Sequence, residues 1–332
     1  KNIGRGIVVV AKSPTTQSSI SGAHVHLNED GSAQVLVGAS EIGQGMEVVM
    51  SQIAAEELGM PIEAVGIKSA DTAVTPYDRG TFSSRVTFYA GMAVKKAAED
   101  ARNQLLELAS KITEIPVGEL AVENQRIISQ KQLGLSLSFQ DVMEHAHMRE
   151  KPILGRGSYG GKGDYPKLPH KAQGKESVPG WKFAAQAVEI EVDEETGMVK
   201  VRRIVSAHDT GKSLNPLMVK GQIVGGVVMG LGYALHERIQ FDDGQVVNPS
   251  FMDYKIPSSQ EIPEIIPICV EVPLPEGPFG AKGIGELAVV GGVAHHRVGA
   301  ALARAQGLEV GQALLVHRQH IPLPGLVAPD LE

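Results

Sequence analysis

The sequence predicts an α+β protein built of two mixed α/β lobes, and three observations support this prediction. The chain has 332 residues, enough for two domains of ordinary size, each with its own core. Short β-branched runs alternate with longer helical patterns in residues 1–150 and again in residues 181–332. Between them, residues 151–180 interleave Lys, Gly and Pro without apolar periodicity, which is typical of a long connecting loop.

The first lobe opens with three predicted strands, at residues 6–11, 23–27 and 34–37, recognised by β-branched content and alternation. Residues 45–58 then carry apolar side chains near helical spacing and predict a helix. The longest predicted helix covers about residues 86–112, where alanines and leucines recur on one face. Such a face is expected to pack against a sheet.

The second lobe opens with two predicted strands, residues 183–192 and 199–206, joined as a hairpin by the turn 194–197. A predicted helix at residues 217–237 contains several interior glycines, namely Gly221, Gly225, Gly226, Gly230 and Gly232. Each of them costs about 1 kcal/mol relative to alanine. Either another helix or a ligand is therefore expected to approach this backbone more closely than a side chain would permit.

Composition narrows the possible classes of function. Hydrophobic residues make up 42% and charged residues 21%, close to globular averages, and no apolar run is expected to reach the roughly 20 residues of a membrane span. Residues 1–6 hold charge and glycine rather than the apolar core of a signal peptide, which predicts a cytoplasmic location. The net charge of -7 comes without a basic patch, which argues against nucleic acid as a partner.

Potential metal ligands are few. Cys269 is the one cysteine, so the chain holds no internal disulfide and no Cys-x-x-Cys arrangement for zinc or an iron-sulfur cluster. His24 and His26 share one face of a predicted strand, but no further ligand is spaced to complete a metal site. If the chain takes part in redox chemistry, its electrons must leave through another polypeptide.

The first run that could carry chemistry is the glycine-rich turn at residues 38–45, between a strand and a helix. Such a turn offers backbone N–H groups and a positive helix end to an anion, usually phosphate. Gln44, between Gly43 and Gly45, is free to offer its amide to the edge of a ring. A plain strand-to-helix turn is the alternative.

The second run, residues 80–85, stands just ahead of the longest predicted helix. Hydroxyl groups and an arginine at a helix N-terminus suit a phosphate or a polar ring, which they would bind by charge-assisted hydrogen bonds. The alternative is an ordinary N-cap made by Ser83 or Ser84, with Arg85 in solvent.

The third run, residues 209–216, directly precedes the glycine-rich helix. Gln222 near the start of that helix could contact a cofactor, and the glycines that follow favour this interpretation. The alternative is surface capping by Asp209 and Asn215.

The fourth run, residues 280–286, contains three glycines, which let the chain pass close to a ligand. Its last residue, Glu286, stands where a helix is expected to begin at about Leu287. This glutamate is either an ordinary partner of the helix dipole or a general base. As a base it would need a raised pKa, obtained by burial in a water-poor pocket.

Taken in this order, the four runs resemble the molybdopterin-binding subunit of the xanthine dehydrogenase and aldehyde oxidase family, the molybdenum hydroxylases. Residues 34–110 are similar to the stretch around that family's Gly-Gln-Gly cofactor loop and the Ser-Arg turn after it. Residues 183–237 are similar to its Asp-x-Gly, Asn-Pro and Gly-Gln segment. Residues 254–257 and 280–286 are similar to its closing catalytic segment, so the resemblance covers roughly residues 3–290.

The resemblance implies two cofactor-binding lobes, residues 1–150 and 181–332, of which the second carries the catalytic segment. It implies that Glu286 is the catalytic base and that Phe82 and Ser83 lie close to molybdenum, which the pterin holds without protein ligands. It also implies a set of residues that contact the molybdopterin cofactor, in its cytosine dinucleotide form: Gly43, Gln44, Gly45, Phe82, Ser83, Ser84, Arg85, Gln222, Lys282 and Gly283.

The implied reaction is hydroxylation of an N-heteroaromatic compound, such as a purine or nicotinate, or of an aldehyde, with oxygen taken from water. Electrons would pass to Fe-S clusters and FAD on partner subunits. The family's upstream half of the molybdenum region is not found in this sequence, so a further polypeptide is expected to supply it. Such a split resembles the molybdenum subunit of nicotinate dehydrogenase; a truncated chain is the competing explanation.

Other interpretations remain open at this point. A carbon monoxide dehydrogenase or hydroxybenzoyl-CoA reductase type of subunit would carry the same runs, and the run at residues 80–85 leans slightly toward the former. A cofactor-free fragment that only binds partners is the alternative from a different class. After Leu287 the sequence departs from the family pattern, so family packing is not expected for the last 40 residues.

Overall fold

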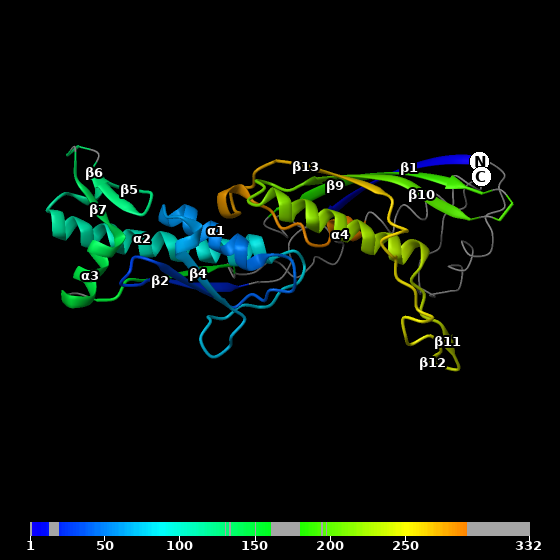
Figure 1. Ribbon diagram of the computed structural model, residues 1–332, viewed down its shortest axis with the longest axis horizontal. Coiled ribbons are helices and arrows are strands. Elements are labelled where there is room, and N and C mark those ends of the chain that lie inside the picture. The colour runs from blue at the N-terminus through cyan, green and yellow to red at the C-terminus, as the bar shows by residue number, and fades with distance from the viewer. Residues whose placement is uncertain are drawn as a thin grey trace, which may run out of the picture.

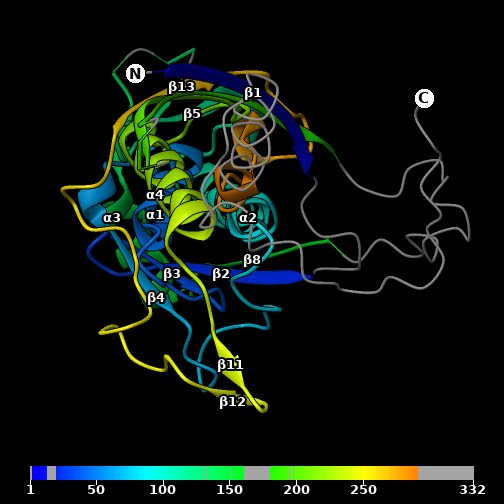
Figure 2. The ribbon, with the colours of Figure 1, turned by 90° about the vertical axis from the view of Figure 1, so that its right-hand side faces the viewer.

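A computed structural model describes residues 2–12, 20–160 and 180–290, apart from residues 130, 133, 150, 194 and 197. It has two mixed α/β lobes, placed end to end along the long axis (Figure 1). The predicted α+β class is therefore confirmed. In both views a layer of helices lies between the sheet of one lobe and the sheet of the other (Figure 2).

The first lobe is a four-stranded sheet covered on one face by two helices. Only β3 and β4 are parallel; the other neighbouring strands run antiparallel. Alternate residues of β2 and β3 are buried, as the period of two in their sequences predicts. The strands, in sheet order, are β4 (Val65–Ser69), β3 (Ala33–Val37), β2 (Ser21–Leu27) and β8 (Leu154–Tyr159).

The helices α1 (Met46–Leu58) and α2 (Gly91–Thr113) match the two predicted helices within a few residues. A short π-helical turn, η2 (Val86–Ala90), leads into α2. The alanine-rich face of α2 packs so closely on β8 that a Cβ at Gly155 would lie 2.0 Å from the carbonyl oxygen of Ala97. Small residues on both elements thus permit this contact.

One strand lies where the sequence predicted a loop. β8 falls within residues 151–180, and it completes the first sheet by pairing with β2. Its alternation was hidden because the positions that face α2 are glycines, Gly155 and Gly157, rather than apolar side chains. The rest of the predicted loop, residues 161–179, lies outside the described part of the chain.

The far end of the first lobe carries three short strands and a helix. The strands pair in chain order and are followed directly by the helix, which contacts α2. These elements are β5 (Leu120–Glu123), β6 (Arg126–Ser129), β7 (Ser136–Ser138) and α3 (Phe139–Arg149). Two single 3₁₀ turns stand before β4 and β5: η1 (Ile62–Ala64) and η3 (Val117–Glu119).

The second lobe is a four-stranded sheet in the order β1 (Asn2–Lys12), β9 (Lys182–Val192), β10 (Val199–Asp209) and β13 (Glu264–Val270). The predicted hairpin is confirmed as the antiparallel pair β9 and β10. The first strand of the chain also belongs here, because β1 pairs with β9 along its whole length. Residues 2–12 were expected in the first lobe, since a strand pattern does not name its partner.

Shorter elements complete the second lobe. Beyond α4 the chain forms a two-residue hairpin, β11 (Phe241–Asp242) with β12 (Gln245–Val246). A 3₁₀ turn, η4 (Pro278–Gly280), precedes the predicted catalytic segment. Helical conformation resumes at Leu287, as predicted, and the description ends at residue 290.

Helix α4 (Pro216–Leu235) packs on β13 and β10. Its 20 residues have a mean hydropathy of 1.3, so it is long and apolar enough to cross a membrane by length and composition alone. The expectation that no segment reaches this length is therefore wrong, although a single such helix is weak evidence because core helices pass the same test. Of its glycines, Gly226 packs against Ala288 whereas Gly221 and Gly225 face open space.

The two lobes meet where α1, α4 and the η2 turn begin. A Cβ at Gly45 would lie 2.4 Å from the sulfur of Met218, so this glycine lets the start of α1 touch α4. Asn215 also donates a hydrogen bond of 3.3 Å to Gln52. These contacts bring the four predicted runs to one place.

Candidate functional site

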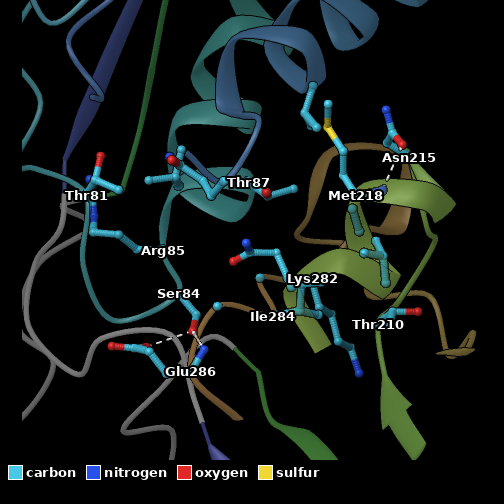
Figure 3. Close-up of a pocket in the computed structure, with 18 of the residues that line it drawn as sticks. Thr81, Ser84, Arg85, Thr87, Thr210, Asn215, Met218, Lys282, Ile284 and Glu286 are labelled. Carbon is cyan, nitrogen blue, oxygen red and sulfur yellow. Dashed lines mark hydrogen bonds between the residues drawn. The ribbon is translucent and has the colours of Figure 1, made fainter. Parts of the chain in front are cut away.

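The four runs line one cavity of about 420 Å³ between the lobes. All the predicted site residues except Gly45 belong to its lining, and they come from segments that are up to about 240 residues apart in the chain. Figure 3 shows Ser84 and Glu286 facing each other at one side of this cavity, with Met218 and Asn215 at the other.

The glycine-rich turn before α1 carries its own anion. The carboxylate of Glu41 accepts hydrogen bonds from the backbone N–H groups of Gly43 at 2.8 Å, Gly45 at 3.0 Å and Glu47 at 3.1 Å. Burial raises the pKa of Glu41, but these N–H groups outweigh it and the net pKa is lowered. The predicted phosphate cradle is therefore filled by a side chain of the turn itself.

Gln44 is held within the same turn. Its Oε1 accepts a hydrogen bond from the N–H of Ile42 at 2.7 Å, and its Nε2 donates to the carbonyl oxygen of Ser40 at 3.0 Å. The prediction that this amide is free was wrong, because the turn is short enough for the side chain to bond its own backbone. At Gly43 the cavity wall has no side chain and borders open space, since a Cβ there would meet nothing within 4 Å.

The turn before η2 is strained. Ser83 and Ser84 both have φ of 53°, a left-handed conformation that costs a non-glycine residue about 1–2 kcal/mol. The strain directs the Ser84 hydroxyl across the lobe boundary instead of toward the helix. The N-cap alternative was therefore wrong: Arg85 is the N-cap residue of η2, and no side chain caps that turn.

Arg85 is fully buried rather than solvated. Its Nη1 donates to Asp78 at 2.7 Å and to the carbonyl oxygen of Gly80 at 2.8 Å, and its Nη2 donates to Ser21 at 2.6 Å. The guanidinium carbon also lies 5.8 Å from the centre of the Phe82 ring. Arg85 thus ties the strained turn to β2, and it shapes the cavity wall through that turn.

The third run both caps α4 and lines the cavity. The side chain of Asn215 accepts a hydrogen bond from the N–H of Met218 at 3.1 Å, which confirms the capping alternative for this residue. Gln222 is half-buried in the cavity wall and makes no hydrogen bond within the described part of the chain. Its amide is therefore available to a bound molecule.

The fourth run crosses from the second lobe to the strained turn of the first. A Cβ at Gly283 would lie 1.8 Å from the carbonyl oxygen of Ser84, so only glycine allows this approach. Three residues later, the hydroxyl of Ser84 donates to Oε2 of Glu286 at 2.7 Å and accepts from the Glu286 N–H at 3.0 Å. One serine thus fixes both the main chain and the carboxylate of Glu286.

The carboxylate of Glu286 is also ion-paired. Lys12, at the end of β1, places its Nζ 2.8 Å from the same Oε2. Burial raises the pKa of Glu286, but the bonds from Lys12 and Ser84 and the charge of Lys182 outweigh it and hold the pKa below its ordinary value. The raised pKa that a general base would need is therefore not found in this chain, because Lys12 and Lys182, both distant from Glu286 in the sequence, lie near it.

Two lysines of the site were missed. Lys12 and Lys182 are directly opposite each other in the β1–β9 pair. Lys182 is 1% exposed and donates a hydrogen bond to the carbonyl oxygen of Gly283. Burial, followed by repulsion from Lys12, lowers the pKa of Lys182 to about 7. The alternation of β9 did indicate that Lys182 is buried, because this residue lies on the same face of the strand as the apolar residues Ala184 and Val188.

The charged end of Lys282 points toward the second lobe. Its Nζ donates to Asp209 at 2.6 Å and to the carbonyl oxygen of Trp181 at 3.2 Å. Only its stem can therefore contribute to the cavity wall. Within the described ranges no group of three His, Cys, Asp or Glu side chains could hold a metal ion. A metal at this site would need ligands from another source.

A family model described as the molybdopterin cofactor-binding domain matches residues 1–263. The chain is 31% identical over 322 residues to a putative xanthine dehydrogenase molybdenum-binding subunit of Escherichia coli, covering 94% of this chain and 40% of the relative. It is 33% identical over 308 residues to subunit gamma of the 6-hydroxypseudooxynicotine dehydrogenase complex of Paenarthrobacter nicotinovorans, covering 90% and 36%. The chain thus spans well under half of these relatives.

Solved structures share the fold. A Cu,Mo-CO dehydrogenase structure superposes with a TM-score of 0.81 at 26% identity, covering 92% of this chain and 38% of the other. The aldehyde oxidoreductase from Desulfovibrio desulfuricans superposes with a TM-score of 0.69 at 26% identity, covering 90% and 30%. The arrangement of both lobes is therefore shared over nearly the whole chain.

Gly283→Ala should destabilise the protein by about 1–3 kcal/mol or more, because a methyl group cannot fit against the Ser84 carbonyl. Denaturant unfolding of the full chain measures this loss. Gly221→Ala is the matched control: its added methyl meets open space in α4, and helix propensity should raise stability by up to about 1 kcal/mol. Equal effects of the two substitutions would contradict the close approach.

The lowered pKa of Glu286 predicts a pH dependence. Its ion pair stabilises the fold above the ordinary pKa of a glutamate, and this contribution is lost as pH falls through the lowered folded value. Glu286→Gln should therefore be less stable than the parent at pH 7, and the difference should shrink in acid. Unfolding of both proteins from pH 7 down to the lowest pH at which they stay folded tests this. A constant difference would be the contrary result.

Proposed function

The chain belongs to the molybdopterin cofactor-binding family, and on this premise we propose that it is the catalytic part of a molybdenum hydroxylase, with Glu286 as the base. The observation that carries the proposal is the placement of Glu286 by Ser84 at the wall of the cavity between the lobes. The relatives named as molybdenum-binding or dehydrogenase subunits support it. Because the chain spans only part of their length, the activity of the whole protein is a proposal.

The residues at the cavity fit such a cofactor. A volume of about 420 Å³ lies in the range of small-molecule sites, its wall is bare at Gly43, and the amide of Gln222 is available. When bound, molybdopterin carries the molybdenum and supplies two-electron redox chemistry. The cofactor contacts proposed for this chain come from Gly43, Gln44, Phe82, Gln222 and Gly283, with Gly45, Ser83, Ser84, Arg85 and Lys282 supporting them.

Glu286 is arranged to take a proton at one oxygen. Oε2 is held by Ser84 and Lys12, whereas Oε1 has no hydrogen-bond partner within the described residues. The low pKa keeps the carboxylate ionised at neutral pH, so it is ready to accept a proton. Closure of the half-exposed site by the rest of the enzyme would remove water and raise this pKa toward the value that a base needs.

We propose an N-heteroaromatic compound or an aldehyde as the substrate, a cytosine dinucleotide form of the cofactor, and partner subunits with Fe-S clusters and FAD. The nicotine-derived substrate in the name of one relative supports an N-heteroaromatic. We further propose that a separate polypeptide or segment supplies the upstream half of the molybdenum region. A cytoplasmic location stays a prediction.

A carbon monoxide dehydrogenase type is the second candidate, because the large chain of that enzyme from Afipia carboxidovorans is 31% identical over 284 residues. Copper in the soft Cu(I) state prefers thiolate ligands. Cys269, the one cysteine of the sequence, lies in β13 rather than in the cavity lining, so a thiolate for copper would have to come from another polypeptide or segment.

The assembly purified with its partner subunits should contain about one molybdenum and one pterin per copy of this chain, as one cofactor site implies. Glu286→Gln should lower turnover by roughly 10²–10⁴-fold, the usual contribution of a general base, and leave the cofactor content unchanged. Elemental analysis, pterin fluorescence and steady-state kinetics measure these quantities.

Glu276→Gln is the matched control, because this exposed glutamate lies outside the cavity. Normal turnover in Glu286→Gln would overturn the assignment of the base. Absence of both molybdenum and pterin from the intact assembly would instead favour the alternative that this chain is a cofactor-free binding fragment.

A further inference from the structure

Strand β9 carries two polar side chains on the face that it turns toward the protein interior. Lys182 and Gln186 are each 1% exposed, and their neighbours in the same phase are Ala184 and Val188. A buried amine or amide is costly unless it is hydrogen-bonded, so these two residues need a compensating contact. Neither residue is part of the cavity lining or of the predicted site.

Both side chains bond to the segment that carries Glu286. Lys182 donates to the carbonyl oxygen of Gly283, three residues before the glutamate. Gln186 donates to the carbonyl oxygen of Ala288, two residues after it, at 2.9 Å. The two donors are four residues apart on one strand, roughly 13 Å along its length, so the strand sets the spacing of both contacts.

We propose that Lys182 and Gln186 are positioning residues that clamp the main chain on both sides of Glu286 and thereby hold its carboxylate against Ser84. This inference rests on the proposed function only for the role of Glu286 as a base. The clamp itself is a property of the chain without cofactor. Three contacts then fix the glutamate: two on its flanking carbonyls and one at its own N–H and carboxylate.

The clamp also carries charge. Five titratable groups face Lys182: Lys12 on β1, Asp209 and His208 on β10, and Lys282 and Glu286 on the closing segment, residues 282–288. His208 stays neutral, because burial and then Lys182 lower its pKa to about 4, and its Nε2 lies 2.7 Å from the Ser206 hydroxyl. The pKa of Lys182 is about 7, so its charge changes near neutral pH.

Because the charge of Lys182 changes near neutral pH, the strength of the clamp should depend on pH. When the closing segment opens, Lys182 reaches water and its pKa returns toward the ordinary value of a lysine, so above pH 7 the opening takes up a proton. Opening therefore costs more free energy as pH rises through neutrality. Protection of the closing segment should rise over the same pH range.

Hydrogen exchange of the full chain, followed by mass spectrometry over residues 283–288, tests the clamp without cofactor or partner. Lys182→Met and Gln186→Leu should each speed the exchange of these amides by about tenfold, the effect of losing one net hydrogen bond of roughly 1.4 kcal/mol. Lys182→Arg should restore part of the protection. Lys200→Met, an exposed lysine of the same sheet, should behave like the parent.

Two features separate the clamp from a general loss of stability. Exchange in the core of α2 should stay unchanged in every variant, and the rise in protection above pH 7 should disappear in Lys182→Met. Parent-like exchange of residues 283–288 in both Lys182→Met and Gln186→Leu would overturn the proposal. So would equal acceleration throughout the chain. Neither outcome depends on molybdenum content or turnover, so a failure here is distinct from a failure of the proposed function.

Discussion

The close approach of Gly283 to the carbonyl oxygen of Ser84 is the constraint on which the rest of the site depends. It brings a segment of the second lobe into van der Waals contact with the turn of the first. Ser84 can meet it only because both Ser83 and Ser84 are left-handed, and the buried Arg85 holds that strained turn in place. From this contact the chain needs only three residues to reach Glu286 and the start of the following helix.

The electrostatics of the site follow from where the strands lie. Because β1 pairs with β9, the first described strand of the chain ends at its last described segment, and Lys12 reaches Glu286. The same pairing places Lys182 opposite Lys12 beneath the closing segment. The bonds from Lys12 and Ser84 and the charge of Lys182 hold the pKa of Glu286 low, whereas burial and then repulsion from Lys12 lower the pKa of Lys182 to about 7.

Local patterns in the sequence were enough for much of the fold. The hairpin of β9 and β10 and the helices α1, α2 and α4 follow from periodicity, and the order of the four runs was sufficient for the family resemblance. Pairing between distant strands could not be predicted, since a strand pattern does not specify a partner. The strand β8 was hidden because glycines occupy its buried positions.

At the site, it was easier to predict which residues lie there than to predict their hydrogen bonds, burial and pKa values. All the candidate residues except Gly45 line one cavity, but Gln44 is bonded within its own turn and Glu41 fills the cradle that was expected to bind an anion. Arg85 is buried against Asp78, a contact that requires β2 and the turn to be folded together. The pKa of Glu286 depends on lysines far away in sequence, so its direction could not be read locally.

The contact between Ser84 and Glu286 joins the two lobes into one site. A double-mutant cycle measures it most directly: Ser84→Ala, Glu286→Ala and the double variant, with the free energy of unfolding of each full chain. We expect a coupling energy of about 1 kcal/mol or more, because each partner loses its bond when the other is removed. Effects that add to within about 0.3 kcal/mol would contradict it.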